Sequence, residues 1–294
     1  MSFRVGLSVD TKKASISEAV ALGAESLEIF VPPDLKWETD ARALRETLAE
    51  TGLPYTVHTF LTAMLAHEDP GIRSQVVAKA LEIVDFTAAI GAPVVTFHPA
   101  TTRKLEEPAP VKVSGGLAWF IEQIDYHVTV DLEESFSATI ESFRAFCRRA
   151  GEHGIAIGLE NIDYSPLFHP RIDEFDDIVR VLEAVDSPHL KLCLDVCHAQ
   201  ISDKPPQEWI HALGREIAHV HVSDTRGRIS WQHGHLEIGD GYIDWRGVIE
   251  ALEAVGYDGN MTVEARWDNF ARSKDILTRY RTSSNQDLAT NQGR

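Results

Sequence analysis

The sequence has few cysteines and no long apolar run. Three cysteines in 294 residues cannot form the disulfide framework of a small secreted protein, which favours a reducing compartment and a cytoplasmic location. The first residues, MSFRVGLSVD, lack the basic and apolar regions of a signal peptide, so we expect none. Because no run of about 18 apolar residues occurs, we also expect no membrane-spanning segment.

Positive charge is scarce as well. The chain has 28 Lys and Arg against 45 Asp and Glu, which gives a formal net charge of −17 at pH 7. Affinity for phosphate groups comes largely from Lys and Arg, so this balance disfavours nonspecific binding to nucleic acid or to an anionic membrane. An acidic enzyme with a local basic groove stays open as an alternative, although the sequence contains no coherent basic stripe.

Short apolar runs alternate with amphipathic helical patterns along most of the chain. In residues 74–91, for example, apolar residues recur with a period near 3.6 and a glycine follows as a helix stop. Similar glycines stand between other predicted helices and the strands that follow them. Eight runs are predicted as strands, namely residues 4–9, 26–31, 55–59, 93–98, 155–161, 190–196, 217–224 and 261–265.

Eight strands that alternate with helices predict one (β/α)8 TIM barrel of the α/β class over residues 1–282. A doubly wound open sheet is the alternative, but its Gly-rich phosphate fingerprint is missing after the first strand. Residues 99–134 are long for the loop after the fourth strand, and we predict a lid insertion there. We expect the polar residues 283–294 to form a disordered tail.

The later predicted strands all end in a histidine or a carboxylate. The carboxyl ends of the strands form the active site of a TIM barrel, so these side chains are expected to converge. Converging carboxylates repel one another, and a divalent cation removes that repulsion. Carboxylate with imidazole is typical of Zn²⁺, Mn²⁺, Fe²⁺ or Co²⁺ sites, so the pattern predicts a metal site. The residues at or just beyond these ends are His58, His98, Glu160, Asn161, Asp195, His198, His221, Asp224, His233, His235 and Glu264.

The segments around these residues resemble the xylose-isomerase-like TIM-barrel superfamily. That superfamily contains sugar isomerases and epimerases, including those acting on sugar phosphates, and the endonuclease IV group of abasic-site nucleases. The resemblance runs from about residue 5 to residue 270 and is specific as a set. The segments that carry it are VHTF (57–60), FHPA (97–100), LENI (159–162), LDVCHA (194–199), HVHVSD (219–224), HGHLEIGDG (233–241) and VEA (263–265).

The resemblance implies a site built on four positions. Glu160, Asp195, His221 and Glu264 would hold one divalent cation, with Mn²⁺, Zn²⁺, Co²⁺ and Mg²⁺ as candidates. Glu160 and Glu264 would also be the acid and base that move a proton next to a carbonyl, through a metal-bound enediolate. The implied protein is a metal-dependent isomerase or epimerase of carbohydrate metabolism. Its partner would be a sugar, a sugar phosphate or a keto-polyol.

The nuclease branch is the first alternative, since it binds up to three metal ions. His58, His98, His198 and His235 match further ligands of its cluster. His233 stands where that branch has an aspartate, which is a departure at the third ion. A multi-metal site suits hydrolysis of a phosphodiester in abasic DNA. In the isomerase interpretation, the same histidines line a polar substrate pocket.

Two further classes stay open. A dehydratase or lyase acting on a keto-sugar or an inositol would share the enolisation step and then eliminate a leaving group. A non-catalytic binding protein is disfavoured, because it would tolerate loss of one acid–base glutamate and both are present. Arg226, Arg266 and Trp119 are further candidates for substrate binding. The oligomeric state is left open, and a homo-oligomer is one option.

Residues 219–241 hold four histidines in two pairs. We interpret this segment as the end of the seventh strand and the loop after it, which would bring the second pair over the metal. His219 lies two residues deeper than His221 on the same strand face, so we expect it to hydrogen-bond inside the barrel. Gly239 and Gly241 would let the loop turn close to the site.

Overall fold

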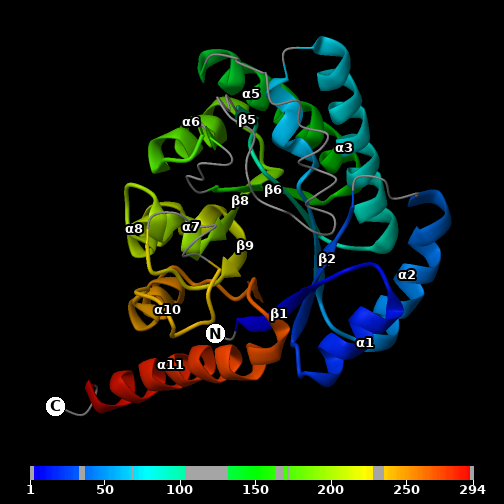
Figure 1. Ribbon diagram of the computed structural model, residues 1–294. Helices are drawn as coiled ribbons and strands as arrows, with labels where there is room; N and C mark the ends of the chain where they lie inside the picture. Colours follow the sequence, from blue (N-terminus) through cyan, green and yellow to red (C-terminus); the bar gives the residue numbers. More distant parts are fainter. Residues whose placement is uncertain are drawn as a thin grey trace, which may run out of the picture.

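The strands form a closed parallel barrel (Figure 1). The computed structural model describes residues 3–32, 37–67, 69–102, 132–162, 169–170, 172–227 and 235–291. The strand order around the barrel is β1-β10-β9-β8-β6-β4-β3-β2. Their bounds are β1 Arg4–Val9, β2 Ser26–Phe30, β3 Tyr55–Thr59, β4 Val94–Phe97, β6 Ala156–Glu160, β8 Leu190–Asp195, β9 Ile217–Val222 and β10 Asn260–Val263. Each predicted strand is therefore confirmed, and the open-sheet alternative is wrong because β1 pairs with β10.

Helices cover the outside of the barrel, as in Figure 1. Helix α3 shows how the sequence sets their ends. The Asp69 side chain accepts a hydrogen bond from Gly71 N at 2.7 Å, and Gly91 ends the helix with φ 89°. The bounds are α1 Lys13–Ala21, α2 Trp37–Thr51, α3 Pro70–Ile90, α5 Leu132–His153, α6 Phe175–Val185, α7 Val196–Ile201, α8 Pro206–Leu213, α10 Trp245–Ala254 and α11 Phe270–Asn291. Three 3-10 turns are η1 Leu61–Ala66, η2 Gly214–Glu216 and η3 Trp267–Asn269.

The structure describes only part of the predicted lid and most of the range that was expected as a tail. The predicted lid at 99–134 contains β5, Thr101–Thr102, which pairs antiparallel with β7, His169–Pro170. Residues 103–131 lie outside the described residues, so the lid stays a prediction. Helix α11 extends into the range expected as a tail, and the domain limit at residue 282 also stays a prediction.

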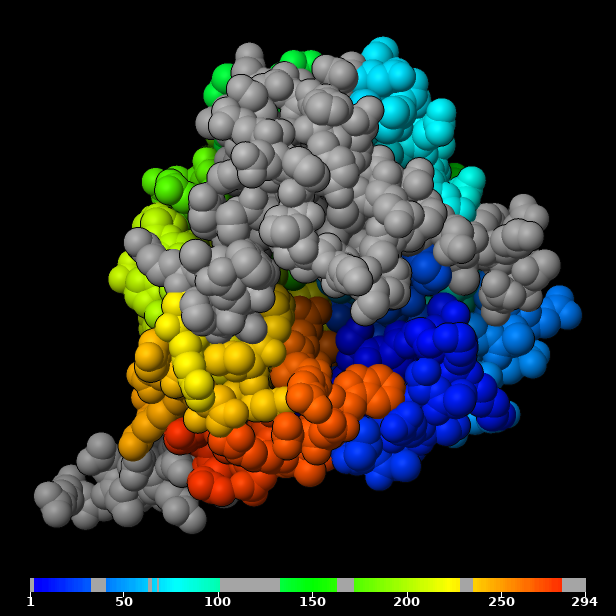
Figure 2. All heavy atoms as spheres, viewed as in Figure 1, coloured from blue at the N-terminus to red at the C-terminus, as the bar shows by residue number. Residues whose placement is uncertain are grey.

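The first and last parts of the chain lie against each other. Figure 2 shows the blue N-terminal and the orange-to-red C-terminal segments side by side on one face. Arg281 Nη1 donates to Phe3 O at 3.0 Å, and Lys274 Nζ donates to Gly23 O at 2.6 Å. These contacts connect α11 to the residue before β1 and to the loop after α1, and the pairing of β1 with β10 closes the barrel.

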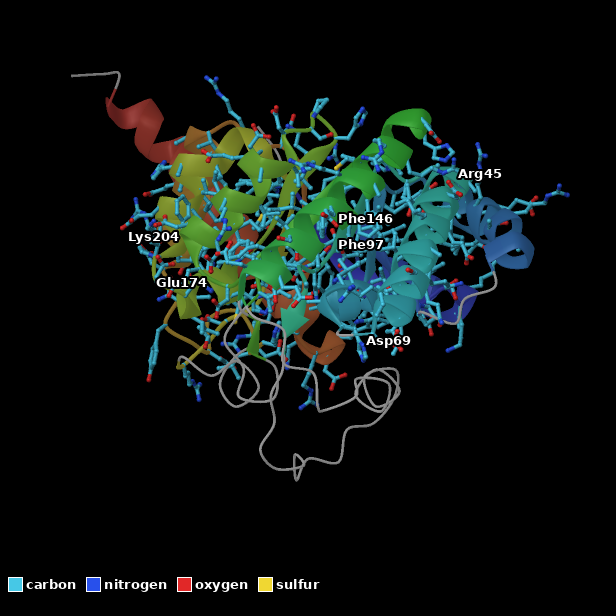
Figure 3. All side chains as sticks on the ribbon, turned by 90° about the horizontal axis from the view of Figure 1, so that it is seen from above. Arg45, Asp69, Phe97, Phe146, Glu174 and Lys204 are labelled. Atoms are coloured by element: carbon cyan, nitrogen blue, oxygen red, sulfur yellow. The ribbon has the colours of Figure 1, made fainter. Side chains whose placement is uncertain are left out.

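The hydrophobic core lies between the strands and the helices. Phe97 of β4 packs on Phe146 of α5, with ring centroids 5.2 Å apart (Figure 3). On β2, Leu27 and Ile29 belong to this core. Alternate residues of the strands point into the barrel, where they are buried and mostly polar. The inward set includes Ser26, Glu28, Thr56, His58, Thr96, Gly158, Glu160, Cys193, Asp195, His219, His221 and Thr262.

The three cysteines are buried and unpaired. Burial raises the pKa of Cys147 to about 11 and that of Cys193 to about 12, so both stay protonated at neutral pH. In the part of the chain that the structure describes, no helix has the length and apolar character needed to cross a bilayer.

Candidate metal centre

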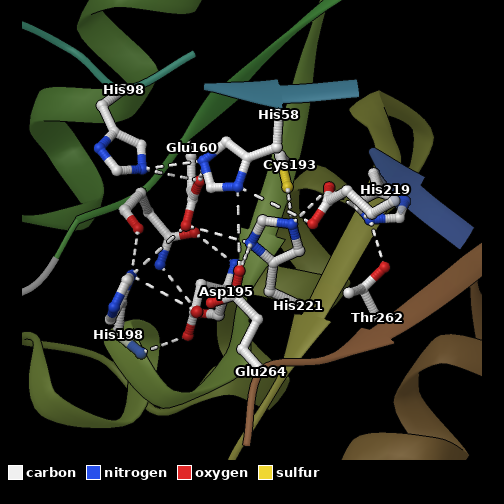
Figure 4. A network of polar contacts seen from close by, with 12 residues as sticks. His58, His98, Glu160, Cys193, Asp195, His198, His219, His221, Thr262 and Glu264 are labelled. Atoms are coloured by element: carbon white, nitrogen blue, oxygen red, sulfur yellow. Dashed lines mark hydrogen bonds and ion pairs between the residues drawn. The ribbon is translucent and has the colours of Figure 1, made fainter. Parts of the chain in front are cut away.

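Several residues predicted from the strand ends converge in one cluster, among them His58, His98, Glu160, Asp195, His198, His221 and Glu264 (Figure 4). Glu160 ends β6, Asp195 ends β8, His221 is on β9, and Glu264 directly follows β10. Ligand atoms of these four residues all lie within 4.8 Å of one another. Three of the side chains are at most 1% exposed, whereas Glu264 is 18% exposed and lies nearest to solvent. The structure thus brings together the four positions that the resemblance implied.

His221 is the centre of this group. Its Nδ1 atom lies 3.1 Å from Glu160 Oε1 and 3.4 Å from Glu264 Oε1. Its Nε2 atom lies 2.9 Å from Oε1 of Glu28, a residue of β2. The ring therefore has one nitrogen inside the four-residue group and the other outside it.

One carboxylate oxygen of the group, the buried Asp195 Oδ2, has no hydrogen-bond partner among the described residues. His198 Nδ1 lies 3.6 Å from it but donates to Asn161 O. Glu160 Oε2 is also buried and has two imidazoles beside it. An unpaired buried acceptor loses its hydration without compensation, which costs about 1–3 kcal/mol, and more for a charged group. A divalent cation bound to Asp195 Oδ2 would remove that cost. The donor set of three carboxylates and one imidazole therefore fits such a cation.

Asp195 is fixed by its backbone as well as by its side chain. Asn161 Nδ2 donates to Asp195 O at 2.9 Å, and Asp195 N donates to Asn161 Oδ1 at 2.8 Å. The pairing of β6 with β8 ends at Glu160 and Cys193, so the Asn161 amide continues the ladder where the backbone no longer does. Asp195 Oδ1 accepts from His198 N at 2.7 Å and caps helix α7.

Two pairs of imidazoles surround the four-residue group. The Nε2 atoms of His58 and His98 are 3.2 Å apart, and they lie 3.2 and 3.1 Å from Glu160 Oε2. The Nε2 atoms of His198 and His235 are 3.3 Å apart. These pairs give two further groups that could hold a cation, one with Glu160 and one with Asp195. His233 lies outside the described residues.

The two glutamates of the group have their pKa values moved in opposite directions. Burial favours the neutral form of Glu160, but the imidazoles of His221, His98 and His58 outweigh it and hold its pKa well below the usual range. Burial raises the pKa of Glu264, and the nearby carboxylates of Glu160 and Asp195 raise it further against the effect of His221. Such a divergence is typical of an acid and a base that act together.

The loop after β9 is held by one buried carboxylate. Asp224 accepts from Gly239 N at 2.9 Å, from Ile243 N at 3.2 Å and from Trp245 Nε1 at 2.9 Å. Gly239 has φ 91°, and a Cβ atom on Gly241 would lie 2.0 Å from Asp224 Oδ1. The two glycines therefore permit a close turn around Asp224, and a role of this turn at the metal site stays a prediction. The turn places His235 beside His198.

Glu28 is the polar residue that the strand-end pattern missed. It lies within β2, not at its end, and its side chain is fully buried. The available signal was an acidic residue inside the apolar run SLEIF. His219, expected to hydrogen-bond inside the barrel, lies 3.0 Å from Thr262 Oγ1 and 3.1 Å from Glu28 Oε1, which confirms that prediction.

The weaker candidates are not joined to this cluster by a described contact. Arg226 donates through Nε to Asp240 O on the surface. Arg266 pairs with Asp268 at 3.0 Å, and its side chain is 79% exposed. Trp119 lies outside the described residues. A substrate-binding role for these three residues stays a prediction.

The family model described as xylose isomerase-like TIM barrel matches residues 16–285. The chain belongs to this family. An uncharacterized protein of Methanocaldococcus jannaschii is 31% identical over 167 residues, which are 55% of this chain and 54% of that protein. The chain therefore matches about half the length of that relative. A D-psicose 3-epimerase of Ruminiclostridium cellulolyticum is 25% identical over 86% of this chain and 77% of its own length.

Solved structures share the fold. A D-tagatose 3-epimerase-like protein superposes with a TM-score of 0.76 at 21% identity, over 96% of this chain and 99% of its own. The family match and this superposition confirm both the resemblance and the TIM barrel predicted from the sequence.

Proposed function

We propose that this protein is a divalent-metal-dependent sugar isomerase or epimerase that transfers a proton next to a carbonyl. The observation that carries the proposal is the pair Glu160 and Glu264 beside His221 Nδ1, with pKa values moved in opposite directions. The names of the relatives support the same class, since they include a D-psicose 3-epimerase and a D-tagatose 3-epimerase-like protein.

Glu160, Asp195, His221 and Glu264 would hold the cation, with Mn²⁺, Zn²⁺, Co²⁺ and Mg²⁺ as candidates. When bound, such a cation polarises a carbonyl and lowers the pKa of the adjacent C–H. Glu160, kept ionised by its imidazole neighbours, would take the proton. Glu264 is the more exposed carboxyl and has a raised pKa, so it would return a proton to the substrate carbon.

The imidazoles around the carboxylates would bind the sugar hydroxyls. His198 Nδ1 donates to Asn161 O at 2.9 Å, so in the neutral ring Nε2 carries the lone pair that can accept from a hydroxyl. His98 has a pKa lowered chiefly by burial, which keeps it neutral and able to act in the same way. The substrate would be a small carbohydrate in the cytoplasm, and a homo-oligomer is compatible with this site.

The test is exchange of deuterium from D2O into ketoses, with D-psicose and D-tagatose first, after loading with Mn²⁺ or Co²⁺. Glu160→Gln and Glu264→Gln should each lower exchange by about 10²–10⁴-fold. Glu216→Gln changes a surface partner of Lys191 and is the matched control, with no expected effect. Near-normal exchange in either site variant would overturn the acid–base assignment. Release of water from the substrate, giving a dehydrated product, would instead identify the dehydratase or lyase alternative.

A second candidate function is a multi-metal phosphodiesterase acting on abasic DNA. The two imidazole pairs favour it, because each lies beside a carboxylate of the central group and supplies a further cation position. Cleavage of an abasic duplex by the Zn²⁺-loaded protein tests this candidate. No cleavage, with ketose exchange in the same preparation, would exclude it.

A further inference from the structure

Glu28 lies under the candidate metal centre, and neither interpretation of the site uses it. Its side chain is fully buried, and its carboxylate has the imidazoles of His221, His219 and His58 as described ion-pair partners. Glu28 Oε1 lies 2.9 Å from His221 Nε2 and 3.1 Å from His219 Nε2. A buried carboxylate is costly unless its hydrogen bonds are satisfied, so its position needs these donors.

Both nitrogens of His221 face a carboxylate. Nε2 lies 2.9 Å from Glu28 Oε1, and Nδ1 lies 3.1 Å from Glu160 Oε1. Glu160 belongs to the four-residue group and Glu28 does not, so a cation bound in that group would take the lone pair of Nδ1. The proton of the neutral ring is then on Nε2, which donates to Glu28. Cys193 Sγ lies 3.6 Å from the same nitrogen and is a weaker acceptor.

We propose that Glu28 is a positioning residue for the cation. It holds the His221 ring at one angle and in the Nε2–H form, which presents the Nδ1 lone pair to the metal group. His219 Nε2 lies 3.1 Å from the same oxygen of Glu28, and Thr262 Oγ1 lies 3.0 Å from that nitrogen of His219. This inference rests on the proposed function, because it assumes a cation among the four residues of the centre.

The first measurement is cation affinity in the purified full chain. Glu28→Gln and Glu28→Leu should raise the Kd for Mn²⁺ by about 10–100-fold. Thr262→Val is the matched control: it removes a hydrogen bond from the same buried network but leaves the contact of Glu28 with His221, and its Kd should stay within twofold of wild type. Equal affinity in Glu28→Gln and wild type, or an equal loss in Thr262→Val, would overturn the inference.

The second measurement needs no variant and so does not depend on how a variant folds. Nitrogen-15 NMR of histidine in the wild-type protein loaded with diamagnetic Zn²⁺ should show His221 protonated on Nε2 and metal-bound through Nδ1. A His221 ring protonated on Nδ1 and metal-bound through Nε2 would overturn the role of Glu28 but not the proposed function. A wild-type chain that takes up neither Mn²⁺ nor Zn²⁺ overturns the proposed function, and this inference with it.

Discussion

The Nε2 atoms of His198 and His235 lie 3.3 Å apart, although one residue is on α7 and the other is in the loop after β9. His198 donates through Nδ1 to Asn161 O, so its Nε2 lone pair faces His235 in the neutral ring. Two imidazole nitrogens at this distance share either a proton or a cation. The choice between them separates a one-metal site from a multi-metal site.

His235→Ala decides this question through metal stoichiometry. We expect close to one cation per chain in wild type and in the variant, because His235 is not one of the four central residues. The variant should mainly raise the KM for the sugar. Elemental analysis of protein purified without chelator or added metal measures the stoichiometry. Close to three cations in wild type and fewer in the variant would favour the phosphodiesterase.

Asn161→Ala should destabilise the fold and weaken the metal centre together. The variant loses both hydrogen bonds to the Asp195 backbone and leaves two buried groups unsatisfied, which costs about 1–3 kcal/mol for each. Thermal unfolding and Mn²⁺ titration measure the two effects. Asn269→Ala, which removes an amide bonded to Glu237 away from the centre, is the control and should change neither strongly. An unchanged Mn²⁺ affinity in Asn161→Ala would show that Asp195 does not depend on this contact.

Gly241→Ala should displace the loop that carries His235. The added Cβ atom would lie 2.0 Å from Asp224 Oδ1 and 2.4 Å from Thr225 O, so the loop has to move. Overpacking of this kind costs about 1–3 kcal/mol, and we expect ketose exchange to fall with it. Gly154→Ala is the control, since Gly154 has φ 70° but nothing within 4 Å of an added Cβ. Gly154→Ala should lose stability and keep its activity. Loss of exchange in Gly154→Ala with normal exchange in Gly241→Ala would contradict the role of the loop.

The ion pair between Asp85 and Arg149 should make the free energy of unfolding depend on pH in the acid range. Arg149 of α5 contacts both carboxylate oxygens of Asp85 of α3, at 2.6 and 2.8 Å. The hydrogen bonds from Arg149 hold the pKa of Asp85 below its usual value, against the effect of burial. A depressed folded-state pKa contributes stability above the unfolded-state value of about 4, and the contribution disappears as the pH falls through the folded-state value.

Asp85→Asn should therefore lower Tm at pH 7, and the difference from wild type should shrink as the pH is lowered below about 4. Circular dichroism melts across that range measure it. Glu82→Gln removes an exposed partner of Lys79 on the same helix and should leave Tm unchanged at each pH. A Tm difference that does not vary with pH would assign the effect of Asp85 to packing.

The sequence predicts the barrel and most of the centre because both depend on local patterns. Strand runs alternate with helices, and parallel strands of a barrel end at one edge, so the residues at those ends meet. His58, Asp195 and His221 follow from that rule. Glu28 does not, because its partner His221 is 193 positions away in the chain and across the barrel. Asn161 was found by position, but its bonds to the Asp195 backbone depend on the register of β6 and β8.

The inward residues of the barrel are mostly polar, and the apolar residues of the same strands face the helices. The charged groups of the centre are thus surrounded by a layer of apolar side chains. This layer lowers the local dielectric constant and strengthens each electrostatic interaction among the charged groups. On β2, Leu27 and Ile29 pack in the hydrophobic core, while Glu28 between them contacts His221. On β2, one set of alternate residues therefore packs the core and the other faces the centre, so a substitution in the second set leaves the core-packing side chains of the strand unchanged.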